Sequence, residues 1–266
     1  MNNYEKLEGM VAATFTPMDE NGDVNLSVID KYADWIASTP IKGVFVCGTT
    51  GEFSSLTIDE RNLILEKWLV SARKRFKVIA HVGSNCQRSA MELARHAAQV
   101  GADAIASIAP SFFKPGTVDE LVDFFAPICH SAAGLPFYYY NMPSITGVNL
   151  PVDKFLVEGK KKIPNLVGTK FTHNNLMEMG VCIELEQHRF EVLHGYDEIL
   201  ISGLAMGAVA GVGSTYNYIP NVYQAIFDSM KMNDLETARH NQIKSIRTVE
   251  VIIKYGGGVR GGKAIM

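Results

Sequence analysis

The chain has 266 residues, 47% of them hydrophobic, so it can bury the core of one large α/β domain or of two small ones. Its 25 lysines and arginines nearly balance its 28 aspartates and glutamates, and no basic stripe alternates with aromatic residues. This charge pattern lacks the positive field that holds a polyanion, so we do not expect nucleic acid as a partner.

The cysteines and the apolar runs exclude several further classes of protein. Cys47, Cys86, Cys129 and Cys182 are widely spaced and form no Cys-x-x-Cys pair, which argues against a zinc site and a disulfide framework. Neither a His-Glu-x-x-His nor a Gly-x-Ser-x-Gly motif is present. No apolar run is long enough to span a bilayer, and the N-terminus lacks a signal-peptide pattern. We expect a cytoplasmic protein without a metal and without a membrane contact.

Short apolar runs recur along the chain and predict strands. They cover residues 11–15, 43–47, 78–82, 104–108, 137–140, 167–171, 190–193 and 208–212. Helical patterns lie between them, for example over residues 26–37, 58–75, 89–100, 118–131 and 223–230. Strands that are apolar throughout, without alternation, are typical of a parallel sheet covered by helices.

The repetition predicts one closed barrel. Eight strand–helix units within about 220 residues, with no linker between them, are what a (β/α)8 TIM barrel of the α/β class requires. We expect a single domain over residues 1–266, with the barrel at about 8–230 and a C-terminal helical part at about 231–266. The alternative is an open, doubly wound sheet. It is disfavoured because no Gly-x-Gly-x-x-Gly follows the first run and no P-loop is present.

Polar residues follow or end several of the predicted strands. In a TIM barrel, chemistry occurs at the C-terminal ends of the strands. The residues in such positions are Thr49, Thr50, Tyr140, Lys170, Asp197, Glu198 and Ser214. Their convergence on one rim predicts an active site there.

Lys170 and Tyr140 are the candidates for covalent chemistry. An amine on a buried strand loses the water around its ammonium form, so its neutral form can attack a carbonyl carbon. A nearby phenol could move the proton. In the alternative interpretation, the stem of Lys170 packs while its amine reaches solvent, and Tyr140 is a core aromatic residue.

Two loops are candidates for binding a substrate. Residues 48–52, Gly-Thr-Thr-Gly-Glu, could turn successive backbone N–H groups towards a carboxylate or phosphate, although such loops are also common structural turns. Asp197 and Glu198 could accept hydrogen bonds from the hydroxyls of a polyol. Alternatively, Asp197 is the N-cap of a helix and Glu198 its first-turn acid.

The motifs resemble one known family. Gly-Thr-Thr-Gly-Glu at residues 48–52, Tyr-Asn-Met-Pro-Ser-Ile-Thr-Gly-Val at 140–148 and Gly-Thr-Lys at 168–170 are similar to the dihydrodipicolinate synthase/N-acetylneuraminate lyase superfamily. The resemblance covers nearly the whole chain. It implies a pyruvate-dependent class I aldolase that assembles as a homotetramer, with Lys170 forming a Schiff base and no cofactor. Relatives continue into further C-terminal helices, so we expect this extension to be shortened or missing.

Two positions separate the branches of the superfamily. The synthases carry an arginine two residues after the proline of the tyrosine motif, where this chain has Ile145. The sialic acid lyases are similar to this chain in their Gly-Tyr-Asp-Glu and Gly-Ser-Thr-Tyr-Asn segments, here residues 195–198 and 213–217. Many relatives also have a tyrosine after the fourth strand, where this chain has Ser111-Phe112-Phe113.

The resemblance implies a role for each candidate residue. Thr49 and Thr50 would bind the carboxylate of pyruvate or of sialic acid, and Tyr140 would accept the proton of the C4 hydroxyl. The sugar hydroxyls would be held by Thr172, Gly195, Asp197, Glu198 and Ser214. The alternatives are another aldolase of the superfamily, acting on a 2-keto-3-deoxy sugar acid, and a catalytically silent ligand-binding barrel.

Overall fold

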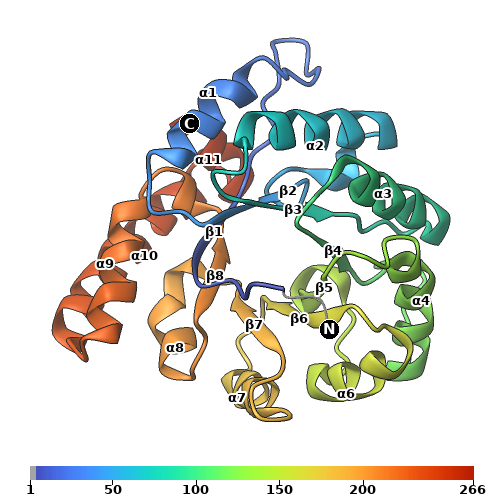
Figure 1. Ribbon diagram of the computed structural model, residues 1–266. Coiled ribbons are helices and arrows are strands. Elements are labelled where there is room, and N and C mark those ends of the chain that lie inside the picture. Colours follow the sequence, from blue (N-terminus) through green and yellow to red (C-terminus); the bar gives the residue numbers. More distant parts are fainter. Residues whose placement is uncertain (1–3) are drawn as a thin grey trace.

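Eight parallel strands close into a barrel in the computed structural model, which describes residues 4–266 (Figure 1). The strands are β1 (Gly9–Ala13), β2 (Gly43–Val46), β3 (Lys77–His81), β4 (Ala104–Ile108), β5 (Phe137–Asn141), β6 (Leu166–Phe171), β7 (Glu191–His194) and β8 (Ala210–Gly213). The last strand pairs with the first, with Met10 opposite Gly211. The predicted (β/α)8 barrel is confirmed, and the alternative prediction of an open, doubly wound sheet is wrong.

Helices surround the barrel (Figure 1). They are α1 (Val28–Ala37), α2 (Ile58–Ala72), α3 (Gln87–Val100), α4 (Val118–His130), α6 (Val152–Lys162), α7 (Leu176–Glu184), α8 (Leu200–Ala205) and α9 (Pro220–Lys231). A short α5 (Pro143–Thr146) follows β5, and α10 (Leu235–Lys254) and α11 (Gly258–Ile265) follow the barrel. Three 3-10 turns, η1 (Phe53–Ser55), η2 (Asp197–Ile199) and η3 (Thr215–Asn217), lie just beyond strands. All five helices expected from the sequence are present, with ends that differ by up to three residues.

The strands pack on both faces, as their continuous apolar character predicts. On β5, Tyr139 faces outward and packs against Phe125 and Phe155 of the helices. Tyr138 and Tyr140 face the barrel interior, Tyr140 against Phe45. Because successive side chains on a strand alternate, this register turns Tyr140 and not Tyr139 towards the axis of the barrel.

The segment before β1 covers the N-terminal end of the barrel (Figure 1). Leu7 is buried, and its backbone N–H donates to Glu191 Oε2 at 2.8 Å. The same oxygen accepts a hydrogen bond from the Tyr138 hydroxyl at 3.1 Å, and Tyr138 in turn contacts the hydroxyl of Tyr4.

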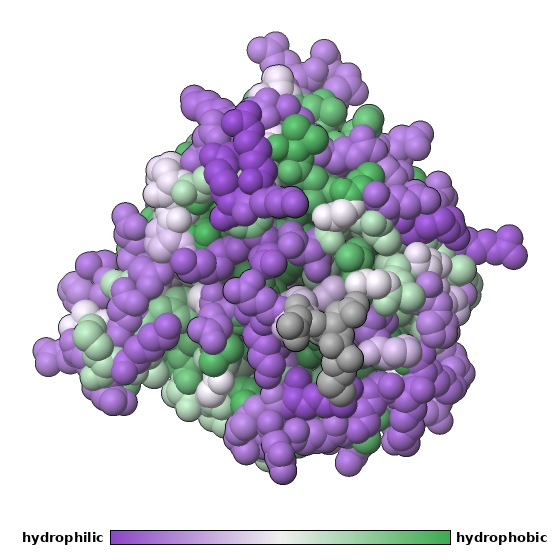
Figure 2. Space-filling view, in the orientation of Figure 1, coloured by the Kyte–Doolittle hydropathy of each residue, from purple (hydrophilic) through white to green (hydrophobic). Residues whose placement is uncertain are grey.

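Polar side chains cover most of the face seen in Figure 2. Within residues 4–266, no helix is both long and apolar enough to cross a membrane.

Candidate active site

Lys170 and Tyr140 lie next to each other inside the C-terminal end of the barrel. They are paired in the register of β6 and β5. The Lys170 Nζ atom is 4.0 Å from the ring centroid of Tyr140 and 4.4 Å from that of Phe45. Only 4% of Lys170 is exposed, so the interpretation in which its amine reaches solvent does not fit this structure. A buried amine beside a phenol is a geometry in which an imine can form and exchange protons.

Thr49 connects the 48–52 loop to this pair. Its Oγ1 lies 3.2 Å from the Tyr140 hydroxyl, which is also 3.1 Å from Met142 Sδ. The loop is a closed turn, because Glu52 N donates to Thr49 O at 3.1 Å and Thr16 Oγ1 donates to Gly51 O at 2.8 Å. Thr50 lies half-buried in the same turn.

His81 supports this loop and was not singled out in the sequence. Cys47, just before the loop, has a φ of 54°, which is unfavourable for a residue with a Cβ. His81 Nδ1 lies 2.8 Å from the Cys47 carbonyl, which can only accept, so Nδ1 carries the hydrogen. Burial and the Arg61 guanidinium hold the pKa of His81 well below its usual range, so the ring is neutral. The available signal was a polar residue within the apolar run at 78–82.

Asp197 is buried at the end of β7 and is not a helix N-cap. Its Oδ2 accepts hydrogen bonds from Thr215 N at 2.9 Å and Thr215 Oγ1 at 2.7 Å, and Tyr196 occupies the N-cap position of η2. The N-cap interpretation is therefore wrong. Burial raises the pKa of the Asp197 carboxyl to about 6, although both hydrogen bonds favour its ionised form.

Asp197 Oδ1 and Thr172 Oγ1, just beyond β7 and β6, are buried and have no hydrogen-bond partner in the described part of the chain. Buried polar atoms are normally paired, so these two are available to hydroxyl groups of a ligand. Two glycines make room for them: a Cβ on Gly213 would lie 1.7 Å from Asp197 Oδ1, and a Cβ on Gly195 would lie 1.9 Å from Thr172 Oγ1.

Glu198 and Ser214 complete the predicted set. Both are half-buried, at the ends of β7 and β8. The structure thus gathers all the predicted residues at the C-terminal ends of β2, β5, β6, β7 and β8. Which substrate atoms they bind stays a prediction.

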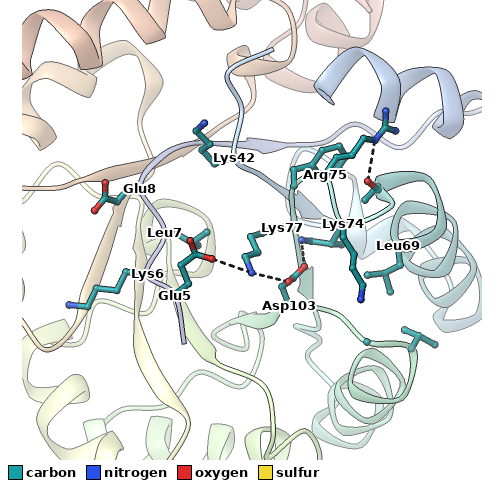
Figure 3. A pocket seen from close by; sticks show the side chains of 15 residues that line it. Glu5, Lys6, Leu7, Glu8, Lys42, Leu69, Lys74, Arg75, Lys77 and Asp103 are labelled. Carbon is teal, nitrogen blue, oxygen red and sulfur yellow. Dashed lines mark hydrogen bonds and ion pairs between the residues drawn. The ribbon is translucent and has the colours of Figure 1, made fainter. Parts of the chain in front are cut away.

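Cavities lie at both ends of the barrel. Near the candidate site, Thr49 borders a cavity of about 210 Å³ that is also lined by Asn85 and Ile145. A groove of about 1100 Å³ lies at the opposite end (Figure 3). Basic residues outnumber acidic ones in its lining, and one of them is paired with lining acids, since Lys77 Nζ lies 3.4 Å from Asp103 and 3.7 Å from Glu5. Because TIM-barrel chemistry belongs to the C-terminal end of the strands, we assign the reaction to the Lys170 side.

Within residues 4–266, no three His, Cys, Asp or Glu side chains are placed to hold a metal ion. The four cysteines are unpaired; Cys47, Cys129 and Cys182 are buried and Cys86 is exposed.

Comparison with known proteins gives consistent matches. The model of the dihydrodipicolinate synthetase family matches residues 6–263. An N-acetylneuraminate lyase of Mus musculus is 43% identical over 265 residues, which are 98% of this chain and 83% of that protein. The human N-acetylneuraminate lyase is 42% identical over the same shares. Among solved structures, a Proteus mirabilis N-acetylneuraminate lyase superposes with a TM-score of 0.96 at 36% identity, covering 98% of this chain and 88% of the other.

Proposed function

The chain belongs to the dihydrodipicolinate synthetase family, and we propose that it is a class I aldolase that reversibly cleaves N-acetylneuraminate to N-acetylmannosamine and pyruvate. The observation that carries this proposal is the buried Lys170 amine, 4.0 Å from the ring centre of Tyr140. The two lyases of mouse and human, each similar over 98% of this chain, support the choice of substrate. The reaction makes the protein a carbon–carbon lyase.

Lys170 would supply the electron sink. Its neutral amine attacks the C2 ketone of the ring-opened substrate, and loss of water leaves a protonated imine. When the C3–C4 bond breaks, its electron pair moves into the imine and forms an enamine on C3. N-acetylmannosamine then leaves, C3 takes up a proton, and water hydrolyses the imine to pyruvate and free Lys170. This sequence needs no metal and no organic cofactor.

Tyr140 would handle the proton of the C4 hydroxyl. That proton must leave as C4 becomes an aldehyde, and Tyr140, with help from the substrate carboxylate, would accept it. Thr49 Oγ1, 3.2 Å from the Tyr140 hydroxyl, fixes the orientation of the phenol. Thr49 and Thr50 would bind the carboxylate of pyruvate through the 48–52 loop.

The opposite side of the rim would hold the sugar. The unpaired Thr172 Oγ1 and Asp197 Oδ1 would accept hydrogen bonds from its hydroxyls, and Glu198 and Ser214 would add others. Gly195 would allow the backbone just after β7 to approach the sugar closely.

We further propose a cytoplasmic homotetramer. Cysteines that are all unpaired suit a reducing compartment. Phe112 and Phe113 are 76% and 86% exposed in the single subunit, and large exposed aromatic residues are typical of an interface. Size-exclusion chromatography with light scattering tests the assembly, and a monomer at working concentration would contradict it.

The decisive experiment is borohydride trapping with mass spectrometry. The protein is reduced in the presence of pyruvate, and pyruvate release from N-acetylneuraminate is measured separately. We expect an adduct on Lys170 together with cleavage. An adduct without cleavage would retain the aldolase class and change the substrate, for example to a 2-keto-3-deoxy sugar acid. Folded protein without an adduct would overturn the proposal in favour of a binding barrel.

A further inference from the structure

Helix α11 reaches the same end of the barrel as the candidate site. Lys263, in its last turn, forms an ion pair with Glu52 of the 48–52 loop. Its Nζ also lies 3.4 Å from Met18 Sδ, in the segment that follows β1. A residue more than two hundred positions away in the sequence therefore contacts the loop that carries Thr49.

Close packing fixes the position of α11. Gly262 lies against the ring of the buried Phe15, where a Cβ would come within 2.3 Å of the ring carbon Cζ. Gly261 lies close to Ile252 of α10, and a Cβ on Gly261 would be 2.9 Å from Ile252 Cγ2. Any larger residue at positions 261 and 262 would push α11 away from Phe15 and Ile252. The two glycines therefore set the distance of α11 from the barrel, and with it the position from which Lys263 reaches Glu52.

Glu52 connects this ion pair to the turn. Its φ of 59° places it in the left-handed region, and its backbone N–H closes the loop on Thr49 O at 3.1 Å. Its Oε1 is shielded from solvent and receives no hydrogen bond of ordinary geometry from residues 4–266. The Lys263 ammonium beside it therefore supplies the compensating charge.

We propose that Lys263 is a positioning residue: by pairing with Glu52 it holds the 48–52 loop so that Thr49 stays in contact with Tyr140. The proposal rests on the proposed function, in which this loop binds the carboxylate of the substrate. In this role Lys263 acts through its contact with Glu52 and not on the substrate itself. Its effect passes through Glu52 and the Thr49 carbonyl to the Thr49 hydroxyl, which lies 3.2 Å from the Tyr140 hydroxyl.

The expected effect is moderate. The Lys263 and Glu52 side chains are 29% and 27% exposed, so solvent and salt weaken the pair only partly. Loss of a pair of this kind corresponds to about a two- to fivefold change in an equilibrium constant. Because the loop binds the carboxylate and Thr49 also orients the Tyr140 hydroxyl, that change should appear in KM, and kcat should fall by no more than the same factor.

The test combines four variants of the ion pair and one control variant. Lys263→Met and Glu52→Gln should each raise the KM for N-acetylneuraminate, and also the pyruvate concentration that gives half-maximal borohydride trapping. The double variant should be no worse than the worse single one, because both remove the same contact. The reversed pair, Lys263→Glu with Glu52→Lys, should regain part of the loss. Arg260→Met is the matched control, since it removes an exposed cation of α11 that is one turn away.

Hydrogen exchange of residues 48–55 provides a readout that does not depend on turnover. It should quicken in Lys263→Met and Glu52→Gln and stay unchanged in Arg260→Met. Unchanged exchange and unchanged KM in both variants would overturn the proposal, as would strictly additive effects in the double variant. If the parent protein forms no pyruvate adduct, the proposed function fails, and the exchange rates alone decide whether Lys263 holds the loop.

Discussion

The amine of Lys170 lies between the faces of Tyr140 and Phe45, where an apolar side chain of similar length would also fit. Removing a polar group from water has a free-energy cost unless it is paired. Lys170 should therefore contribute to activity and lower the stability of the fold, which is common at active sites. A substitution can separate its effect on activity from its effect on stability.

Lys170→Met should abolish turnover and leave the fold intact. Methionine fills similar space without a nucleophile, so neither the pyruvate adduct nor pyruvate release should be detected. The unfolding temperature should be equal to or above that of the parent, by the equivalent of up to about 1 kcal/mol. Lys154→Met, at a side chain that is 71% exposed, is the control and should change neither quantity. Appreciable cleavage by Lys170→Met would contradict the covalent mechanism.

Tyr140→Phe isolates the hydroxyl from the ring. The phenyl ring keeps its contacts with Phe45 and His81, while the proton acceptor is lost. We expect kcat to fall by about 10²-fold or more, with pyruvate still forming an adduct on Lys170. The control is Tyr139→Phe, one position earlier on β5 but on the outer face. Equal losses in both variants would show that the effect is one of packing.

Single residues differ in how well the sequence predicts their positions. Lys170 and Tyr140 could be placed because each stands at the end of an apolar run. Asp197 was ambiguous, because an acid after a strand suits a cap and a ligand equally well, and only its contact with Thr215 decides. The role of His81 depends on a carbonyl more than thirty residues away, which no local pattern shows.

At the scale of elements, all eight strands could be predicted, but their ends only in part: the predicted run 104–108 coincides with β4 (Ala104–Ile108), whereas others are displaced. The first predicted run, 11–15, is displaced by two residues from β1 (Gly9–Ala13), because apolar character continues beyond the last ladder hydrogen bond into Phe15. The run 208–212 is displaced in the other direction, because it begins two residues before β8 (Ala210–Gly213) and ends one residue before the end of that strand. Pairing with neighbouring strands sets these limits, and that pairing is not local in sequence.

Gly213→Ala should disturb the end of β8. The new methyl group would lie 1.7 Å from Asp197 Oδ1, so either the strand or the carboxylate must move. We expect a destabilisation of about 1–3 kcal/mol and a KM for N-acetylneuraminate raised at least tenfold, with pyruvate trapping on Lys170 retained. Gly134→Ala is the control, because no atom lies within 4 Å of its Cβ position. Unchanged KM in Gly213→Ala would remove Asp197 from the sugar site.

For the whole molecule, closure of the barrel followed from the number of strand–helix units, but the contacts that cover its N-terminal end did not. Residues 4–8 carry no regular secondary structure, and nothing in their pattern indicates that they cross the opening. They are tied to β7 by the hydrogen bond from Leu7 N to Glu191. Glu191 lies within the barrel and is 5% exposed. The apolar run at 190–193 predicts a strand but does not predict that its one acidic residue is buried.

Glu191 should make the stability of the whole barrel depend on pH. Burial raises the pKa of its carboxyl to about 7 from an ordinary 4.5, against hydrogen bonds from Leu7 N and Tyr138 that lower it. Between these two values the folded protein holds a proton that the unfolded chain has released. The associated stability is therefore complete below about pH 4.5 and is lost as the pH rises through about 7.

Glu191→Gln should remove this dependence, because the amide oxygen can still accept from Leu7 N and Tyr138 and carries no charge. Above pH 7 the variant should be more stable than the parent by at most about 3 kcal/mol, and below pH 4.5 the two should agree. Urea unfolding from pH 4 to pH 8 measures the difference. Glu8→Gln, at an exposed acid of the same segment, should follow the parent throughout. The free energies of unfolding of Glu191→Gln and of the parent should converge in acid only if Glu191 takes up or releases a proton on unfolding. A difference that is the same at every pH would therefore mean that packing, and not the buried charge, causes the effect.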